Sequence, residues 1–280
     1  MRYTYISFLG SDDYLIGILA LKNRLDVLKS EYPLTVLVSE DISNKSKRIL
    51  KKYGIPYVIK KDYVPSEEIQ KKNTSFGMPQ WSKTFGKLYI FGMTEFDKLV
   101  YVDADMLIKK NIDELFQNKN LSAVIAGVKY PGNENWSLTL NSGLMVIVPK
   151  KNEDVRLFEL IESNKFEKGG DQDIIHLAYP NWSENERLHL KEEYNLLAPY
   201  ELYYVSKKLV NSDKLKVIHY IGATKPWMRS QLSEYKHIIG IIVSGLCISS
   251  SLKGIKFAVQ DYIFYCKLCR RIENDISKME

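Results

Sequence analysis

Short apolar runs alternate with helix-like segments over the first sixty residues of the chain. Tyr3–Leu9 is apolar enough for a buried strand, and the apolar residues of Leu15–Lys29 recur every three or four positions, as in a helix. The elements expected next are a strand at Leu34–Val38, a helix from Asp41 or Ser43 to Lys52, and a strand at Ile55–Ile59. This order predicts an α/β fold with a mixed, mostly parallel sheet and helices on both faces.

The remainder of the chain continues the pattern less regularly, and we expect a single α/β domain over residues 1–228. The further expected elements are a helix at Trp81–Phe96, strands at Leu99–Val102, Ala123–Val128, Leu144–Val148 and Lys216–His219, and helices at Phe158–Ser163 and Asp173–Tyr179. The chain shows no internal repeat and no low-complexity segment.

Residues 229–280 lose the strand alternation and are expected to form a helical C-terminal extension. The apolar residues that recur there at helical spacing are Ala258, Tyr262, Tyr265, Cys269, Ile272 and Ile276. Such a stripe can dock on its own domain, pair with a partner chain or lie on a membrane. The basic residues Lys267, Arg270 and Arg271 sit off the stripe. The pattern leaves all three alternatives open.

Two carboxylates, Asp103 and Asp105, stand one residue apart where the apolar run Leu99–Val102 ends. Strand alternation places side chains at this spacing on the same side. Parallel sheets bind ligands beyond the carboxyl ends of their strands, and the polar turn Gly10–Tyr14 reaches the same edge. Two converging oxygen donors suit Mg²⁺ or Mn²⁺, and through it a substrate diphosphate. Because Asp-x-Asp is also common in solvated turns, the pair needs further support.

Composition narrows the function classes only slightly. The chain has 280 residues, 40 basic and 34 acidic, for a net charge of +6. A basic surface favours anionic partners, but no nucleic-acid-binding motif accompanies it, so we expect no nucleic acid partner. Gly10–Tyr14 does not form the glycine-rich loop of dinucleotide-binding folds, which argues against a dehydrogenase.

The cysteines and the ends of the chain suggest a cytoplasmic protein. All three cysteines lie at or beyond Cys247, which argues against a disulfide framework. Cys266 and Cys269 would share one face of a helix, a simpler explanation than half a zinc site. The N-terminus opens into a strand without a signal-peptide pattern, and the apolar stretch His237–Ile248 is too short to span a membrane.

Further motifs accompany the acid pair along the chain. They are Trp81–Leu88, Asn141-Ser142-Gly143, Gly169-Gly170-Asp171-Gln172, and His219-x-x-Gly222-x-x-Lys225-Pro226-Trp227. Together and in this order they resemble the retaining glycosyltransferases of family 8, which include glycogenin and plant galactinol synthase. The resemblance extends from about Tyr3 to Trp227. It implies a Rossmann-like, GT-A type nucleotide-sugar-binding fold, a UDP-hexose donor, and Mn²⁺ or Mg²⁺ as cofactor.

The resemblance also implies roles for individual residues. It implies metal ligands at Asp103, Asp105 and His219, and catalytic candidates at Asp171, Gln172 and Lys225. It further implies donor-binding residues at Leu9, Tyr14, Lys87, Ala104, Asn141, Ser142, Gly222 and Lys225, with Lys83 as the alternative to Lys87. Several of these have plainer explanations: Asp171 also suits a helix N-cap, and Lys87 a surface lysine. Trp227 suits the core as well as a site.

Two departures from glycogenin-like members leave the donor sugar open. Such members carry an acid in the segment that matches Ile125–Val128, where none stands here, and they can have Asp where this chain has Lys168. Both differences concern the residues expected near the sugar hydroxyls. The resemblance therefore leaves glucose and galactose as alternative donors.

The sequence as a whole predicts a metal-dependent retaining glycosyltransferase that moves a hexose from a UDP-sugar to an acceptor hydroxyl with an α linkage. The acceptor could be a glycan, a lipid-linked molecule or a small polyol, and surface or storage glycan synthesis would use such an enzyme. A homodimer and peripheral contact with the inner membrane face, through the C-terminal helix, are further expectations. The alternatives are a primer protein that glycosylates itself at Tyr203 or Tyr204, although adjacent tyrosines also suit a packed strand, and a non-catalytic nucleotide-sugar-binding protein.

Overall fold

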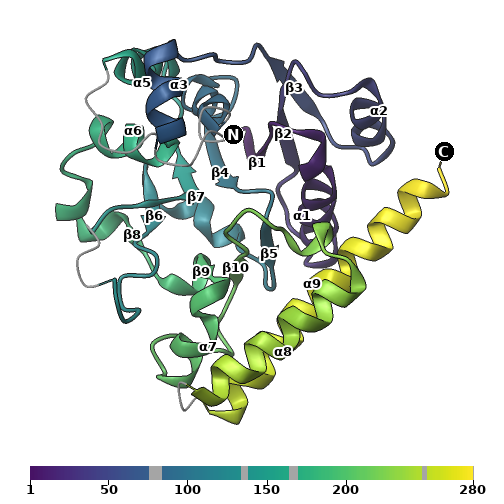
Figure 1. The fold of residues 1–280 in the computed structure, drawn as a ribbon. Coiled ribbons are helices and arrows are strands. Elements are labelled where there is room, and N and C mark those ends of the chain that lie inside the picture. Colours follow the sequence, from purple (N-terminus) through teal and green to yellow (C-terminus); the bar gives the residue numbers. More distant parts are fainter. Residues whose placement is uncertain (76–83, 134–137, 164–169, 248–250, 280) are drawn as a thin grey trace.

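A twisted sheet with helices on both faces forms the centre of the protein (Figure 1). The computed structural model describes residues 1–75, 84–133, 138–163, 170–247 and 251–279. Within them, seven strands lie in the order β3-β2-β1-β4-β7-β6-β8. Their bounds are Tyr3–Leu9 (β1), Leu34–Ser39 (β2), Tyr57–Lys60 (β3), Lys98–Val102 (β4), Ser122–Val124 (β6), Asn141–Ile147 (β7) and His189–Leu190 (β8). All neighbours pair in parallel except β7, which is antiparallel to β4 and β6, so the mostly parallel sheet is confirmed.

Residues of the central strands alternate between two hydrophobic clusters, one on each face of the sheet. In β1, Tyr5 belongs to one cluster and Ile6 to the other. In β4, Val100 and Tyr101 divide in the same way. Helix α1 (Leu15–Val27) packs on the Tyr5 side, whereas α5 (Glu153–Glu162), α6 (Asp171–Ala178) and the 3-10 helix Phe85–Gly92 pack on the Ile6 side. The central strands carry apolar residues that point to both faces of the sheet. Helices therefore cover both faces and keep these residues from water.

A small second sheet connects the end of β4 to a late part of the chain. It consists of β5 (Met106–Ile108), β10 (Val217–His219) and β9 (Leu196–Leu197) in the order β5-β10-β9. β10 is antiparallel to β5, and His219 pairs with Met106. Since β5 begins one residue after Asp105, this pairing brings His219 to the acid pair across more than one hundred residues of sequence.

The other helices complete the surface. They are α2 (Asn44–Lys52), α3 (Glu67–Ser75) and α7 (Ala198–Ser206), with short 3-10 helices at Asp12–Tyr14, Asp113–Gln117, Trp182–Glu184, Glu186–Leu188, Glu192–Tyr194 and Pro226–Met228. Ser43, not Asp41, caps α2, because its Oγ accepts a hydrogen bond from the Ser46 N–H at 3.2 Å. Gly54 follows α2 with φ of +65°, a conformation that suits glycine.

Three expected elements differ in the structure. The first three residues of the helix expected at Trp81–Phe96 lie outside the described residues. The described part forms a 3-10 helix that ends at Gly92. The strand expected at Ala123–Val128 is shorter, because Gly127 takes a φ of +83° and turns the chain. The adjacent tyrosines 203 and 204 lie on a helix, not a strand, because Pro199 starts α7 within its first turn.

The C-terminal helices α8 (Gln231–Cys247) and α9 (Leu252–Ser277) lie side by side along one edge of the molecule (Figure 1). The stripe expected on the tail faces inward: Tyr262, Tyr265 and Cys269 are at most 2% exposed and belong to the same cluster as Tyr5. Docking on its own domain is therefore the confirmed alternative for this stripe, and the stripe is not available to a membrane. Among the described residues, no helix is both long and apolar enough to cross a bilayer.

Candidate active site

The acid pair lies in the turn between β4 and β5, at the carboxyl edge of the large sheet. The Asp103 N–H donates to the Gly143 carbonyl at 2.8 Å, which anchors the turn to β7. The Asp105 carbonyl accepts from the Tyr220 N–H at 3.0 Å, which anchors it to the end of β10. Asp105 is buried and Asp103 is half-buried. Two strands from distant parts of the sequence thus hold both carboxylates in place.

His219 completes a three-residue cluster with the acid pair. Its Nε2 lies 3.2 Å from Asp105 Oδ1 and 3.8 Å from Asp103 Oδ2. One ligand atom from each of these residues lies within 4.8 Å of the others. Gly143 is required here, because a methyl group at that position would come within 2.5 Å of the His219 ring.

Asn195, which is fully buried, determines how the imidazole is oriented. The Gly143 N–H donates to Asn141 Oδ1 at 3.0 Å, and the same oxygen accepts from Asn195 Nδ2 at 2.8 Å. Since the Asn195 amide nitrogen is used in this way, its Oδ1 faces His219 Nδ1 at 3.1 Å. Nδ1 therefore carries the hydrogen, and Nε2, which faces both carboxylates, is the nitrogen that can bind a metal.

The chemistry of the cluster fits a divalent cation. Two carboxylates and one imidazole form a mixed oxygen and nitrogen donor set, and this suits first-row divalent metals. Because three protein donors do not fill the coordination shell of such a cation, a bound cation would keep positions open for further ligands.

A second group of charges lies next to the cluster. Lys87 is buried, and its Nζ lies 2.6 Å from Asp171 Oδ2 and 3.7 Å from Asp103 Oδ1. Ser142 Oγ accepts from Lys87 Nζ at 3.1 Å and donates to Asp171 Oδ2 at 2.7 Å. Asp171 is the first residue of α6, where Gly170 occupies the N-cap position, so the N-cap explanation for Asp171 is wrong. The Gln172 side-chain carbonyl accepts from the Ser142 N–H at 3.2 Å.

Lys225 contacts the other member of the acid pair, Asp105. Its Nζ lies 2.5 Å from Asp105 Oδ2 and 5.8 Å from the centre of the Tyr14 ring. The segment 221–224 that precedes Lys225 is exposed, and Gly222 has a φ of +100°. The Tyr14 ring meets Trp227 edge to face at 6.0 Å between ring centres. This lysine therefore sits on an exposed loop, with its ammonium turned inward.

The pKa values of the two carboxylates of the acid pair are shifted in opposite directions. Burial raises the pKa of Asp103 above its usual value, and the charge of Lys87 only partly offsets this. Burial acts on Asp105 in the same direction, but His219 and Lys225 outweigh it and hold the pKa of Asp105 below its usual value. Burial opposes the charge on both lysines, yet the pKa of each is raised by its carboxylate neighbours. Both lysines are therefore cationic at neutral pH.

Comparisons with known proteins agree with this geometry. The model of glycosyl transferase family 8 matches residues 5–231. The protein belongs to this family. The chain is 30% identical over 224 residues to human glycogenin-1, across 80% of this chain and 61% of that protein. It is 31% identical over 250 residues to the inositol phosphorylceramide glucuronosyltransferase 1 of Arabidopsis thaliana, across 81% of this chain and 42% of that protein.

The fold is shared with a solved structure as well. The galactosyltransferase LgtC, solved in complex with donor and acceptor sugar analogues, superimposes with a TM-score of 0.54 at 16% identity. The match covers 82% of this chain and 91% of that one. The architecture of this family 8 glycosyltransferase is therefore of the GT-A type, as the sequence predicts.

Most of the donor-binding candidates gather around the acid pair of this family 8 enzyme, with two exceptions. Leu9 is fully buried in the core, which leaves its side chain no exposed surface for a ligand. Lys83 lies outside the described residues. Ala104 is buried, and its carbonyl accepts a hydrogen bond of 3.5 Å from the Tyr265 hydroxyl.

Three residues that shape the site were not identified from the sequence. Asn195 has no flanking motif that reveals its contact with His219. Gly17 permits the close approach of α1, because a methyl group there would lie 2.2 Å from the Ala104 carbonyl oxygen. Tyr265 contacts the acid-pair turn from α9. Of these three residues, only Gly17 could have been identified from the sequence, because it is a glycine inside a helical pattern.

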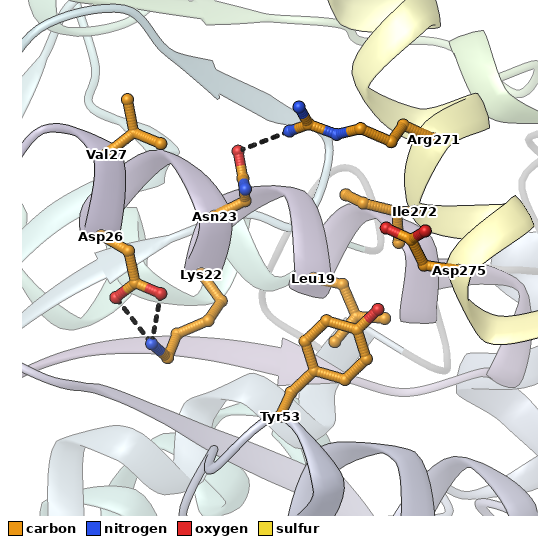
Figure 2. A pocket seen from close by; sticks show the side chains of 9 residues that line it. All are labelled: Leu19, Lys22, Asn23, Asp26, Val27, Tyr53, Arg271, Ile272 and Asp275. Atoms are coloured by element: carbon orange, nitrogen blue, oxygen red, sulfur yellow. Dashed lines mark hydrogen bonds and ion pairs between the residues drawn. The ribbon is translucent and has the colours of Figure 1, made fainter. Parts of the chain in front are cut away.

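A cavity of about 480 Å³ lies apart from these residues, between α1 and the C-terminal part of α9 (Figure 2). Three of its charged side chains are engaged locally, since Lys22 pairs with Asp26, and Arg271 donates to Asn23. None of the acid-pair or lysine residues described above line it. We assign the active site from the convergence of charged side chains at the sheet edge, not from this cavity.

Proposed function

We propose that this enzyme transfers a hexose from a UDP-sugar to an acceptor hydroxyl with retention of configuration, giving an α linkage. The observation that carries the proposal is the convergence of Asp103, Asp105 and His219 with two buried lysines at one sheet edge. A nucleoside diphosphate is the leaving group that needs such a site, because its negative charge grows as the glycosidic bond breaks.

Asp103, Asp105 and His219 would hold the cation, Mn²⁺ or Mg²⁺. When bound, the cation supplies positive charge that stabilises the departing diphosphate. Asn195 supports this set from behind, because it keeps His219 Nε2 directed at the carboxylates.

Lys225 supplies the second positive charge for the leaving group. The loop before Lys225 is exposed, and the Lys225 ammonium is buried beside Asp105. A phosphate bound beside Asp105 would therefore contact this ammonium. Gly222, which has no side chain, allows a main-chain N–H of this loop to approach the phosphate closely. Tyr14, which lies across from Lys225, is the proposed aromatic contact for the uracil base.

Asp171 and Gln172 are proposed to lie beside the transferred sugar, together with Asn141 and Ser142. Asp171 Oδ2 already interacts with both Lys87 and Ser142, which supports a fixed anion and argues against a covalent nucleophile. In the proposed step, the acceptor oxygen bonds to the anomeric carbon on the face from which UDP departs. The bond between the anomeric carbon and the phosphate oxygen of UDP breaks, and the departing phosphate takes the proton of the acceptor hydroxyl.

The donor sugar and acceptor need a direct screen. The relatives named above are a glucuronosyltransferase and a galactosyltransferase, besides glycogenin, so their names do not select one sugar. Hydrolysis of UDP-glucose and UDP-galactose should be measured with Mn²⁺ and with EDTA, followed by glycan, lipid-linked and polyol acceptors. If the protein hydrolyses neither donor faster than an Asp105→Asn variant does, the result contradicts the proposal and favours a non-catalytic nucleotide-sugar-binding protein.

Self-glycosylation is less well supported. Tyr204 is fully buried, and its hydroxyl accepts from the Lys129 N–H at 3.0 Å. Tyr203 is half-buried and packs edge to face with Tyr130. Modification of Tyr204 would require α7 to move. Intact mass after incubation with each UDP-sugar decides the matter, since a self-glycosylating protein gains one or more hexose masses.

A further inference from the structure

Helix α8 exposes a continuous apolar stripe on its outer face. The α8 stripe consists of Leu232, Tyr235, Ile239, Ile242, Val243 and Leu246, each of them exposed. At 100° per residue these six positions fall within about 100° of the helix circumference. They extend over about 21 Å of helix length.

The opposite face of α8 is already occupied by the protein. Ile238 and Ile241 pack against the main cluster. Gly245 lies so close to α9 that a methyl group there would come within 2.4 Å of Ile255. The helix therefore lies against α9 by one face (Figure 1), and the stripe residues remain exposed. A contiguous exposed apolar face of this size marks an interaction surface.

The charges around the stripe are basic. The segment from Arg229 to residue 260 contains four basic residues and one acid. Lys236, Lys253 and Lys256 are exposed. The single acid, Glu234, forms an ion pair with Arg270 of α9. The charges that remain available around the stripe are thus positive.

We propose that the α8 stripe binds the surface of a lipid bilayer that contains anionic headgroups. An apolar helix face flanked by lysines inserts at the boundary between headgroups and acyl chains, while the lysines contact the headgroups. This surface is distinct from the tail stripe expected from the sequence, which is buried. Leu232 follows Trp227 by five residues, so bilayer binding would hold the Lys225 loop near the membrane surface.

A second copy of the chain fits the stripe less well. The stripe has coiled-coil spacing at positions 232, 235, 239, 242 and 246, but it covers only about two heptads, and stable coiled coils usually need three or more. Partner helices also commonly exchange opposite charges beside such a seam, and Lys236 is the exposed charge that α8 offers there.

Flotation of the full chain with vesicles tests the proposal independently of its catalytic activity. Vesicles of phosphatidylcholine alone are compared with vesicles that contain about 30% phosphatidylglycerol, at low and high salt. We expect binding to the anionic vesicles that weakens as salt rises, because exposed charges are screened. No binding to anionic vesicles at low salt would overturn the proposal.

Two pairs of variants identify the contact surface. Ile239→Ser with Leu246→Ser should weaken anionic-vesicle binding by about tenfold or more. The matched control is Val64→Ser with Val155→Ser, at exposed apolar positions on other elements, which should bind as the parent does. Lys236→Glu with Lys253→Glu should also weaken binding by about tenfold or more, whereas Lys51→Glu with Lys52→Glu on α2 should not.

Thermal unfolding and UDP-sugar hydrolysis check that the variants are folded. These properties should be unchanged, because all the substituted side chains are exposed and none lies in the proposed active site. Equal vesicle binding by the stripe variant and its control would overturn the proposal. A vesicle-free dimer that the stripe substitutions dissociate, measured by light scattering, would overturn it too and assign the stripe to a second copy.

Discussion

The two lysine–carboxylate pairs of the proposed active site are built in different ways. Lys87 and Asp171 come from the 3-10 helix Phe85–Gly92 and from α6, and the Ser142 hydroxyl on β7 joins them. Lys225 reaches Asp105 from an exposed loop after β10. The first pair joins residues of two helices and a strand, whereas the second joins a residue after an exposed loop to the acid pair. In the proposed mechanism, the first pair holds the site and Lys225 of the second pair acts on the leaving group.

Lys87→Ala should have the largest effect, because it leaves Asp171 buried with its main charge partner removed. Loss of one partner of a buried ion pair typically costs about 3–5 kcal/mol of unfolding free energy. Activity should fall as well. Chemical denaturation measures the stability, and Lys98→Ala is the control, since Lys98 donates to two main-chain carbonyls. Equal stability losses in both variants would show that the first pair is not a structural element.

Asp105→Asn should lower turnover by at least about a hundredfold, comparable to the loss of a major electrostatic stabiliser. Asp103→Asn should behave similarly, and EDTA should mimic both. Asp26→Asn is the control, because Asp26 is an exposed carboxylate that pairs with Lys22 on α1. The parent enzyme must lose activity in EDTA and recover it with Mn²⁺. Full activity in EDTA would contradict the assigned metal site.

Lys225→Ala should reduce kcat more than it raises KM, by about ten- to a hundredfold, because its charge matters most as the diphosphate departs. Its unfolding free energy should also fall, because Lys225 and Asp105 are both buried, but it should fall less than in Lys87→Ala, because Asp105 keeps its contact with His219 Nε2 at 3.2 Å. Steady-state kinetics and denaturation of the same variant provide both values. If KM alone rises, Lys225 only binds the donor, and the contrast between the two pairs loses its catalytic meaning.

Asn195→Ala should act on metal binding and not on the leaving group, weakening the metal affinity by about ten- to a hundredfold. The variant keeps all three metal ligands but no longer accepts the His219 Nδ1 hydrogen bond. Calorimetric titration with Mn²⁺ measures the affinity directly, without an assay of turnover. Asn120→Ala is a control, because Asn120 accepts from the Val148 N–H elsewhere. An unchanged Mn²⁺ affinity would show that His219 is oriented by its strand alone.

For the C-terminal helices, the pattern of apolar residues does not by itself predict which helix face is buried. The stripe of α9 is regular, and its docking on the domain was one of three open alternatives. The stripe of α8 was read only as an apolar stretch too short for a membrane span. Both helices are apolar on at least one face, so composition does not decide which face is covered. Packing decides it: α9 buries Tyr262, Tyr265 and Cys269 in the core, whereas α8 contacts the core through the partly buried Ile238 and Ile241.

The sequence by itself determined the order of strands and helices, the sheet edge that carries Asp103 and Asp105, and the family, because these depend on local periodicity and on motifs of adjacent residues. The tertiary structure decided which distant residues meet there. The β5–β10 pairing brings His219 to the acid pair, Asn195 contacts His219, and Gly17 of α1 and Tyr265 of α9 contact the acid-pair turn. Such contacts join residues that are remote along the chain. Apart from the motif that contains His219 and the glycine in the helical pattern of α1, no local pattern indicates these contacts, because they follow from strand register and from the packing of α9 against the domain.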